Sequence, residues 1–247
     1  MLKSAFIFDL DDTLYDQCQV FKKMYERFSD EKRLSEEVPT INSQTLKAIF
    51  IKSRHYAEQN FEKIIADPTK RFYYDSLRLR LAFLDHGFEF TVEETNRMDC
   101  LYKEEQTKLC PEPTMIELIE KLQADGHFVG VISNGYSKQQ RDKIKQLNLT
   151  NYLDEEKMLI SQDTQWAKPE RELFDYYIDS HDLSREETYY IGDSYGNDLI
   201  GSWNADITPV WINKYDKELE HSRHNKEFYM ATDYHELPEI IADIITK

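Results

Sequence analysis

The sequence predicts an α/β protein in which a helical domain is inserted into a parallel-sheet core. Short β-rich runs alternate with helical patterns at the N-terminus and again from about residue 126 onward, which is typical of βαβ units. Between them, residues 15–110 contain no convincing strand and are far more numerous than a crossover between parallel strands requires. We therefore expect a core domain of residues 1–14 and 111–247 and a helical domain of residues 15–110.

The first expected strand is the run AFIF at residues 5–8. In the helical block, apolar side chains recur on one helical face at Tyr73, Leu77, Leu81 and Leu84. The sequence DHG at residues 85–87 then provides a glycine stop, and Thr91 with Glu94 matches a capping box that opens another helix. The sequence CPEP at residues 110–113 is the expected hinge at which the chain returns to the core.

The remaining core strands follow this hinge. They are the β-rich runs at residues 127–133, 157–161, 188–192 and 207–212. Residues 213–228 are polar, and we expect a loop with a partial helix there.

Composition restricts the class of protein. The chain has 247 residues, of which 40% are hydrophobic, enough for a buried core. Its net charge of −16 repels phosphate backbones and anionic lipid, which argues against a nucleic acid polymer or a membrane as partner. The three cysteines form no CxxC pair, and the N-terminal apolar run is too short for a signal peptide, so we expect a cytoplasmic protein.

Acidic side chains follow two expected strands, at the edge where α/β sheets bind ligands. Asp9 and Asp11 come after the first strand, and a period of two places both on one side if the backbone stays extended. Repulsion between two neighbouring carboxylates disfavours ionisation of both, so the pKa of one of them rises. The ionised carboxylate then suits a nucleophile, and the protonated one a proton donor. Asp193 and Asp198 follow the strand at 188–192, and oxygen ligands from two strand ends suit Mg²⁺. Each stretch taken alone is equally compatible with an acidic turn.

Two further stretches offer donors for a phosphoryl group. Ser133 and Asn134 begin the sequence SNG after a strand, where a hydroxyl and backbone N–H groups at a helix N-terminus suit anionic oxygens. A helix N-cap without any ligand is the alternative interpretation. Lys168, in AKPE, offers positive charge among the loop acids, whereas the alternative is that this stretch only starts a helix at its proline.

The order of these motifs resembles the haloacid dehalogenase superfamily, in the branch whose α-helical cap lies between the first and second motifs. The pattern is DxDxT at Asp9, Asp11 and Thr13, followed by VISNG, AKPE and GDSYGND. The resemblance spans nearly the whole chain and implies a Rossmann-like core with a mobile cap. The overall layout, including SNGY and WINK, is also similar to that of pyrimidine 5′-nucleotidases and N-acylneuraminate-9-phosphatases.

The resemblance also implies roles for individual residues. Asp9 resembles the nucleophile that forms an aspartyl-phosphate, Asp11 the general acid and base, and Lys168 the lysine of the third motif. Phosphate binding is implied for Thr13, Ser133, Asn134 and Lys168. Binding of Mg²⁺ is implied for Asp9, Asp11, Asp193 and Asp198, with Asp11 contributing its backbone carbonyl.

These roles imply a Mg²⁺-dependent phosphomonoester hydrolase acting on a small phosphorylated metabolite, such as a nucleoside monophosphate or a sugar phosphate. Asp11 argues against the dehalogenases of the superfamily, which do not keep an acid two residues after the nucleophile. A phosphomutase of the same fold and a non-catalytic metabolite-binding protein are the alternatives. The sequence is compatible with either a monomer or a homodimer.

Overall fold

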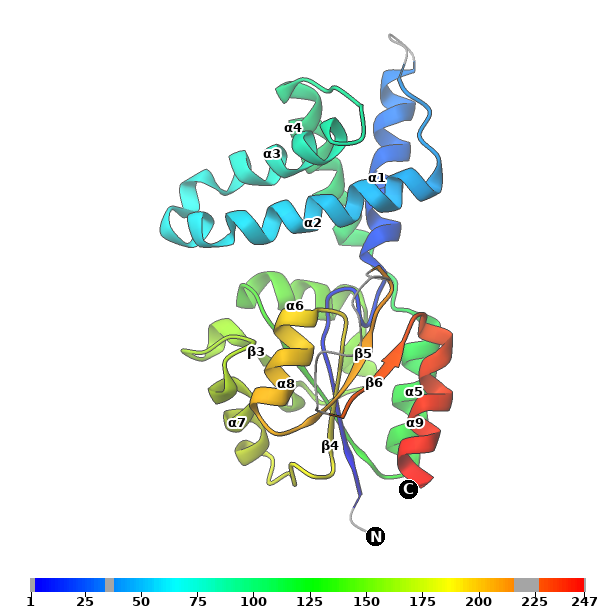
Figure 1. Ribbon diagram of the computed structural model, residues 1–247, viewed down its shortest axis with the longest axis vertical. Coiled ribbons are helices and arrows are strands. Elements are labelled where there is room, and N and C mark those ends of the chain that lie inside the picture. Colours follow the sequence, from blue (N-terminus) through cyan, green and yellow to red (C-terminus); the bar gives the residue numbers. More distant parts are fainter. Residues whose placement is uncertain (1–2, 34–37, 216–226, 247) are drawn as a thin grey trace. The chain divides into compact units, whose positions relative to one another are not determined.

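The chain forms two compact units (Figure 1). The computed structural model describes residues 3–33, 38–215 and 227–246. One unit, called the core unit here, combines Met1–Asp16 with Cys110–Lys247, and the other, the helical unit, is Gln17–Leu109.

In its described residues, the core unit is built on a parallel sheet of six strands in the order β3-β2-β1-β4-β5-β6. The strands are β1 (Ala5–Phe8), β2 (Phe128–Ser133), β3 (Met158–Ile160), β4 (Thr188–Gly192), β5 (Thr208–Ile212) and β6 (Tyr229–Ala231). Strand β1 pairs with β2 on one side and with β4 on the other, so that Ile7 lies opposite Gly130 and Tyr190. This is the order of a doubly wound Rossmann-like sheet, in which ligands bind where the strand order reverses, beside the first strand.

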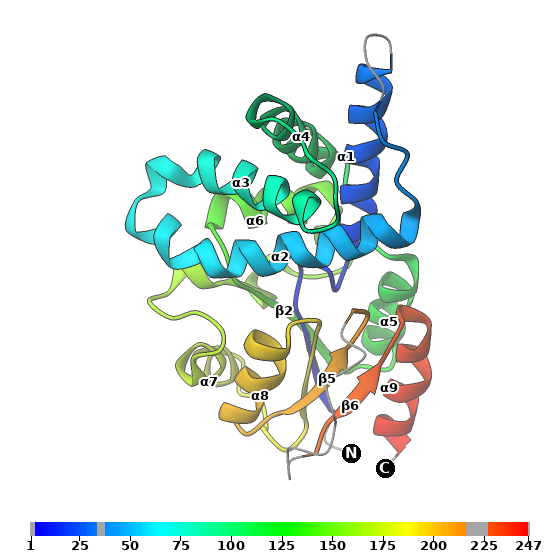
Figure 2. The same cartoon turned by 45° about the horizontal axis from the view of Figure 1, so that its top comes forward.

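Helices cover both faces of the sheet. They are α5 (Pro113–Ala124), α6 (Ser137–Gln146), α7 (Arg171–Ser180), α8 (Ile200–Asn204) and α9 (Leu237–Thr246). Short helical turns lie at Leu149–Asn151, Glu155–Lys157, Ser161–Asp163, Tyr195–Leu199 and Tyr234–Glu236. Figures 1 and 2 both show α5 and α9 side by side on one face, with α7 and α8 together on the other.

The apolar core forms because both faces of the strands are covered. All four residues of β1 are buried, and Ile7 packs in one cluster with Ile132 of β2 and Tyr190 of β4. Helix α7 contributes Leu173 and Phe174 to the same cluster. Continuous apolar runs such as AFIF are what a parallel strand buried on both sides requires.

The helical unit contains only helices among its described residues. They are α1 (Gln17–Lys32), α2 (Ser43–Ala66), α3 (Arg71–Leu84) and α4 (Val92–Glu105), with 3₁₀ turns at Pro68–Lys70 and Gln106–Lys108. Thr91 and Glu94 form both hydrogen bonds of the predicted capping box at the start of α4. Gly87 adopts a φ of +81° just after α3, a conformation that favours glycine, so the predicted stop is also confirmed.

Aromatic rings form the centre of the helical unit. Phe83 of α3 contacts the rings of Phe21, Tyr25 and Phe90, with centroids 6.0, 5.6 and 5.0 Å away. The buried side chains of α3 are Ser76, Leu79, Ala82 and Phe83. The apolar pattern therefore identified α3 as a helix but not its buried face, because Tyr73 and Leu84 of that pattern are 59% and 46% exposed.

The structure confirms the α/β class and the five strands expected from the sequence. Strand β6 was not expected, because the polar stretch expected to be a loop ends at residue 228, directly before it. The loop with a partial helix expected at 213–228 lies largely outside the described residues, which omit 216–226. In the part of the chain that the structure describes, no helix is long and apolar enough to cross a membrane.

Replacing Phe83 by alanine tests the buried face of α3. The ring is fully buried, so we expect the free energy of unfolding to fall by about 3–5 kcal/mol. Its neighbour Leu84 is the matched control, because it is 46% exposed and Leu84→Ala should cost about 0.5 kcal/mol or less. Urea denaturation followed by circular dichroism measures both, and equal costs would contradict this assignment.

Candidate active site

The residues with candidate functions come from the carboxyl ends of three adjacent strands. Asp9 follows β1, Ser133 is the last residue of β2, and Asp193 follows β4. Since these strands are parallel neighbours, their carboxyl ends lie along one edge of the sheet. The core unit therefore presents side chains from separate sequence motifs at a single edge.

Lys168 links two of the acids at this edge. Its Nζ lies 2.5 Å from Asp9 Oδ1 and 2.7 Å from Asp198 Oδ1, and the side chains of all three residues are less than a tenth exposed. The same ammonium donates a hydrogen bond of 2.9 Å to the hydroxyl of Tyr190 on β4. Burial alone would lower the pKa of Lys168, but the charges of Asp198 and Asp9 raise it well above its usual value, so this lysine stays protonated.

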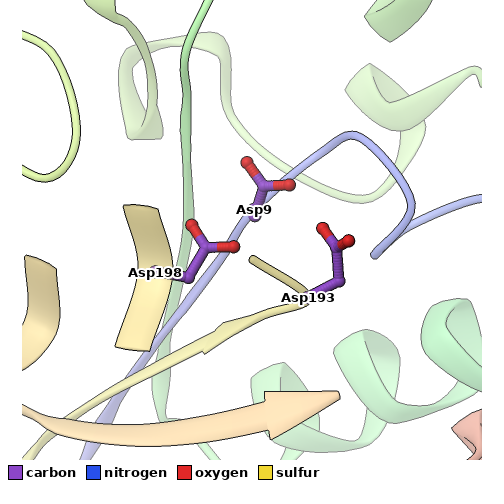
Figure 3. Close-up of side chains that lie close together, drawn as sticks. All are labelled: Asp9, Asp193 and Asp198. Carbon is purple, nitrogen blue, oxygen red and sulfur yellow. The ribbon is translucent and has the colours of Figure 1, made fainter. Parts of the chain in front are cut away.

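Three carboxylates converge beside this lysine (Figure 3). Asp9, Asp193 and Asp198 each place an oxygen within 4.8 Å of the others. Asp198 is held by the Ser194 N–H, which donates a hydrogen bond of 2.8 Å to its Oδ2. Gly192 leaves the room that this carboxylate occupies, because a Cβ at position 192 would lie 2.4 Å from Asp198 Cγ.

The pKa of Asp9 is raised to about 8. Burial is the largest cause, Lys168 opposes it, and the charges of Asp198, Asp193 and Asp11 raise it further. The sequence led us to expect a raised pKa from repulsion between Asp9 and Asp11 alone. In the structure Asp11 is the weakest of these causes, and the extended backbone ends at Phe8, so the alternation of a strand does not continue to Asp11.

The donor set fits a hard divalent cation. Carboxylate oxygens are the ligands that Mg²⁺ prefers, and all three converging side chains supply them. A divalent cation held there would favour the ionised form of Asp9.

Asp11 lies in a different environment from Asp9. Lys143 Nζ is 2.6 and 2.7 Å from its two oxygens, Gln140 Nε2 is 2.8 Å from Oδ2, and the Tyr15 hydroxyl donates to Oδ1. Burial would raise the pKa of Asp11, but Lys143 and these hydrogen bonds together lower it. The two acids of the first motif therefore have pKa values shifted in opposite directions.

The residues expected to bind phosphate differ in their burial and in their hydrogen-bond partners. Ser133 is buried at the end of β2, and its Oγ accepts a hydrogen bond of 2.6 Å from Gln140 Nε2. The side-chain amide of Asn134 binds the backbone N–H and C=O of Lys168, each at 2.9 Å. The Thr13 hydroxyl is fully buried and has no hydrogen-bond partner among the described residues.

A buried ion pair supports the loop after β1. Asp12 is fully buried with a φ of +63°, and Lys214 Nζ lies 2.8 Å from both its carbonyl oxygen and its Oδ1. The hydroxyl of Tyr234 also donates to the Asp12 carbonyl, at 2.9 Å. This pair ties the left-handed turn that follows Asp11 to the chain after β5.

Sequence reasoning missed several residues that contact the candidate site, among them Asp12, Gln140, Lys143 and Lys214. Of these, Asp12 could have been singled out directly, because it lies within the acidic run DLDD. Gln140 and Lys143 lie one turn apart on α6, so a helix after SNG predicts that they share a face. The surrounding sequence SKQQRDKIKQ is too polar to identify that face as the buried one.

The chain belongs to the haloacid dehalogenase-like hydrolase family, whose family model matches residues 6–212. It is 27% identical over 142 residues to pyrimidine 5′-nucleotidase YjjG of Escherichia coli, a match that covers 55% of this chain and 62% of that protein. It is 24% identical over 250 residues to glyceraldehyde 3-phosphate phosphatase of Methanothermobacter thermautotrophicus, which covers 98% of this chain and all of that protein.

Solved structures share the fold at lower identity. A HAD-hydrolase, YfnB, from Bacillus subtilis superposes with a TM-score of 0.66 at 19% identity, covering 97% of this chain and 98% of that chain. The L-2-haloacid dehalogenase of Xanthobacter autotrophicus gives a TM-score of 0.63 at 14% identity, covering 98% of this chain and 99% of that chain. These two likenesses establish the fold and leave the chemistry to be argued from the side chains.

Replacing Gly192 by alanine tests the cradle of Asp198. The new Cβ would lie 2.4 Å from Asp198 Cγ, so the carboxylate must move away from Lys168 and from its two acidic neighbours. We expect a loss of about 1–3 kcal/mol in the free energy of unfolding. We also expect loss of the rise in Tm that added Mg²⁺ produces through preferential binding to the native state.

Gly196 provides the matched control, because a Cβ there meets no atom within 4 Å. Gly196→Ala should keep both the wild-type Tm and its response to Mg²⁺ in differential scanning fluorimetry. An unchanged response in Gly192→Ala would show that Asp198 does not contribute to cation binding.

Proposed function

We propose that the protein is a Mg²⁺-dependent phosphomonoesterase that acts on a small phosphorylated metabolite, such as a nucleoside monophosphate or a sugar phosphate. The observation that carries this proposal is the buried Asp9 carboxylate at the end of the central strand, held by Lys168 beside two further acids. The relatives named as a pyrimidine 5′-nucleotidase and a glyceraldehyde 3-phosphate phosphatase support the same class of reaction.

Asp9 is the group that we assign to attack on phosphorus. Lys168 holds Oδ1, so we assign the new O–P bond to Oδ2, while the O–P bond to the leaving alcohol breaks. This step leaves an aspartyl-phosphate on Asp9. The buried ammonium of Lys168 offsets negative charge on the phosphoryl oxygens as the bonds change.

Asp11 is the group that we assign to proton transfer. Because its lowered pKa leaves Asp11 ionised at rest, it takes up a proton from solvent before the first step and gives it to the departing oxygen. In the second step it takes a proton from the water that attacks phosphorus and returns it to solvent. The second step breaks the bond between Asp9 and phosphorus and releases inorganic phosphate. Both carboxyl groups then return to their starting states, so the cycle balances without another reactant.

Asp9, Asp193 and Asp198 are the side chains that we propose hold Mg²⁺, together with the backbone carbonyl of Asp11. When bound, the ion supplies positive charge that favours the ionised form of Asp9 and offsets the charge of the phosphoryl oxygens. The convergent oxygen donors at this edge support the assignment.

Ser133 is the side chain that we assign to binding the phosphoryl group. Its Oγ accepts from Gln140, so its own hydroxyl hydrogen remains to be donated to a phosphoryl oxygen. Lys168 provides the positive charge. For Thr13 and Asn134 we assign the backbone N–H rather than the side chain, because the Thr13 hydroxyl is buried and the Asn134 amide is bound to Lys168.

The inserted helices, residues 15–110, are the part that we propose acts as a cap and selects the metabolite. Residues 1–14 and 111–247 would then form the catalytic domain. The Leu14 carbonyl accepts a hydrogen bond of 2.9 Å from the Glu112 N–H, so the chain leaves and re-enters the core unit at adjacent positions. Two connections at one point suit a hinge for a mobile domain.

A phosphate-release screen tests the proposed function. The panel contains nucleoside monophosphates, sugar phosphates and p-nitrophenyl phosphate, each with Mg²⁺ and with excess chelator. We expect release from at least one metabolite ester and from the aryl ester, and loss of both on chelation. The kcat/KM of each metabolite ester, divided by that of the aryl ester, measures the selectivity that we assign to the cap.

Release of phosphate in excess chelator would contradict the metal assignment. An isomerised sugar phosphate with little free phosphate would indicate a mutase instead. No phosphate release and no isomerisation anywhere in the panel, from protein that shows a cooperative thermal transition, would contradict the enzymatic proposal.

Substitution of the two acids separates attack from proton transfer. Asp9→Asn should eliminate the phosphoenzyme with every substrate, because a neutral amide is a poor nucleophile. Asp11→Asn should still be phosphorylated by p-nitrophenyl phosphate, whose leaving group departs as a stable phenolate and depends little on a general acid. It should then stall, because no base activates water.

Rapid-quench kinetics measure the difference. The expected signature of Asp11→Asn is a burst of phenolate close to one per active site, followed by turnover slowed by about 10²–10⁴-fold. Equal loss of the burst in both variants would show that Asp11 is needed for attack itself, and the general-acid assignment would then be withdrawn.

A further inference from the structure

Helix α6 presents two buried polar side chains to Asp11. Lys143 is 7% exposed and lies within 2.7 Å of both oxygens of the Asp11 carboxylate. Gln140, one turn earlier on the helix, is 1% exposed, and its Nε2 lies 2.8 Å from Asp11 Oδ2. Two of the three buried residues of this helix are therefore polar, and both contact the proposed proton-transfer group.

Gln140 also contacts the second motif. Its Nε2 lies 2.6 Å from Ser133 Oγ and 3.1 Å from the Asn134 carbonyl oxygen. One side chain thus contacts the acid assigned to proton transfer and the hydroxyl assigned to phosphate binding. Its amide fixes the separation between these two groups.

Gly135 makes room for this side chain. A Cβ at position 135 would lie 3.1 Å from both Cγ and Cδ of Gln140, and the backbone there has a φ of +144°. Both the close approach and the backbone conformation favour glycine. The glycine of the second motif therefore allows Gln140 to reach Ser133 and Asp11.

We propose that Lys143 and Gln140 are positioning residues that hold the Asp11 carboxylate in the orientation used for proton transfer. The inference rests on the proposed function. Lys143 spans both carboxylate oxygens and Gln140 fixes one of them, so together they restrict the rotation of a side chain that is still 26% exposed. A misplacement of about 1 Å in a reacting group costs up to roughly 10²-fold in rate, so the restriction matters for catalysis.

Lys143→Met tests this role, because methionine keeps an unbranched apolar chain and removes the ammonium. We expect turnover of the best alkyl ester from the screen to fall about 10–100-fold. The first release of phenolate from p-nitrophenyl phosphate should keep its wild-type rate, because a phenolate needs no general acid, whereas hydrolysis of the phosphoenzyme should slow, because Asp11 also activates the water. KM and inhibition by inorganic phosphate should stay within about twofold, since Lys143 is assigned to Asp11 and not to the phosphoryl group.

Lys145→Met is the matched control, because Lys145 lies on the same helix and is exposed. It should retain wild-type kinetics with both esters. If Lys143→Met gives no cooperative thermal transition, Gln140→Met replaces it. The readout is then the slower phosphorylation by the alkyl ester against an unchanged rate with saturating p-nitrophenyl phosphate, because Gln140 also contacts Ser133 and its loss can alter phosphate inhibition.

A double-mutant cycle with Asp11→Asn isolates the coupling. Adding Lys143→Met to Asp11→Asn should cause no further loss of turnover, because the positioned group is already gone. Independent, multiplying losses in the double variant would overturn the proposal. An equal loss in the rate of enzyme phosphorylation by the two esters, a raised inhibition constant for phosphate in Lys143→Met, or no effect at all would each do the same. If the wild-type protein releases phosphate while one of these results appears, only this inference fails, whereas an inactive wild-type protein contradicts the proposed function first.

Discussion

Crowding of like charge at the carboxyl edge of the sheet is the constraint on which the rest of the site depends. A buried carboxylate is costly unless it is paired. Lys168 pairs with Asp9 and Asp198 at once, and Lys143 pairs with Asp11. A further positive charge bound beside Asp9 would favour its ionised form.

The backbone that carries these acids is itself held by charge. Asp12 forms a buried ion pair with Lys214, although desolvation of two charges often offsets their attraction. This ion pair positions the backbone, because Lys214 also binds the Asp12 carbonyl and so fixes the left-handed turn that follows Asp11. The loop after β1 and the chain after β5 are thereby joined beside the proposed nucleophile.

How much the sequence revealed depends on the distance between partners along the chain. The strands and both acidic pairs could be predicted because each acid lies within a few residues of an apolar run. The environment of Asp11 could not, since Lys143 is 132 residues away on a helix that offers several lysines. Likewise, the opposite pKa shifts of Asp9 and Asp11 come mainly from burial and from distant partners, which spacing alone does not encode.

The fold does not distinguish dehalogenases from phosphatases, because a haloacid dehalogenase superposes on nearly the whole chain. The side chain at position 11 does distinguish these two classes of enzyme. A residue without a carboxylate there would leave Lys143 buried without its anion and would deprive Gln140 and the Tyr15 hydroxyl of acceptors. Breaking a buried pair in this way typically costs about 3–5 kcal/mol. The core unit is therefore built around an acid at position 11. A halide leaves carbon without a proton, whereas an alkoxide leaves phosphorus poorly unless an acid protonates it.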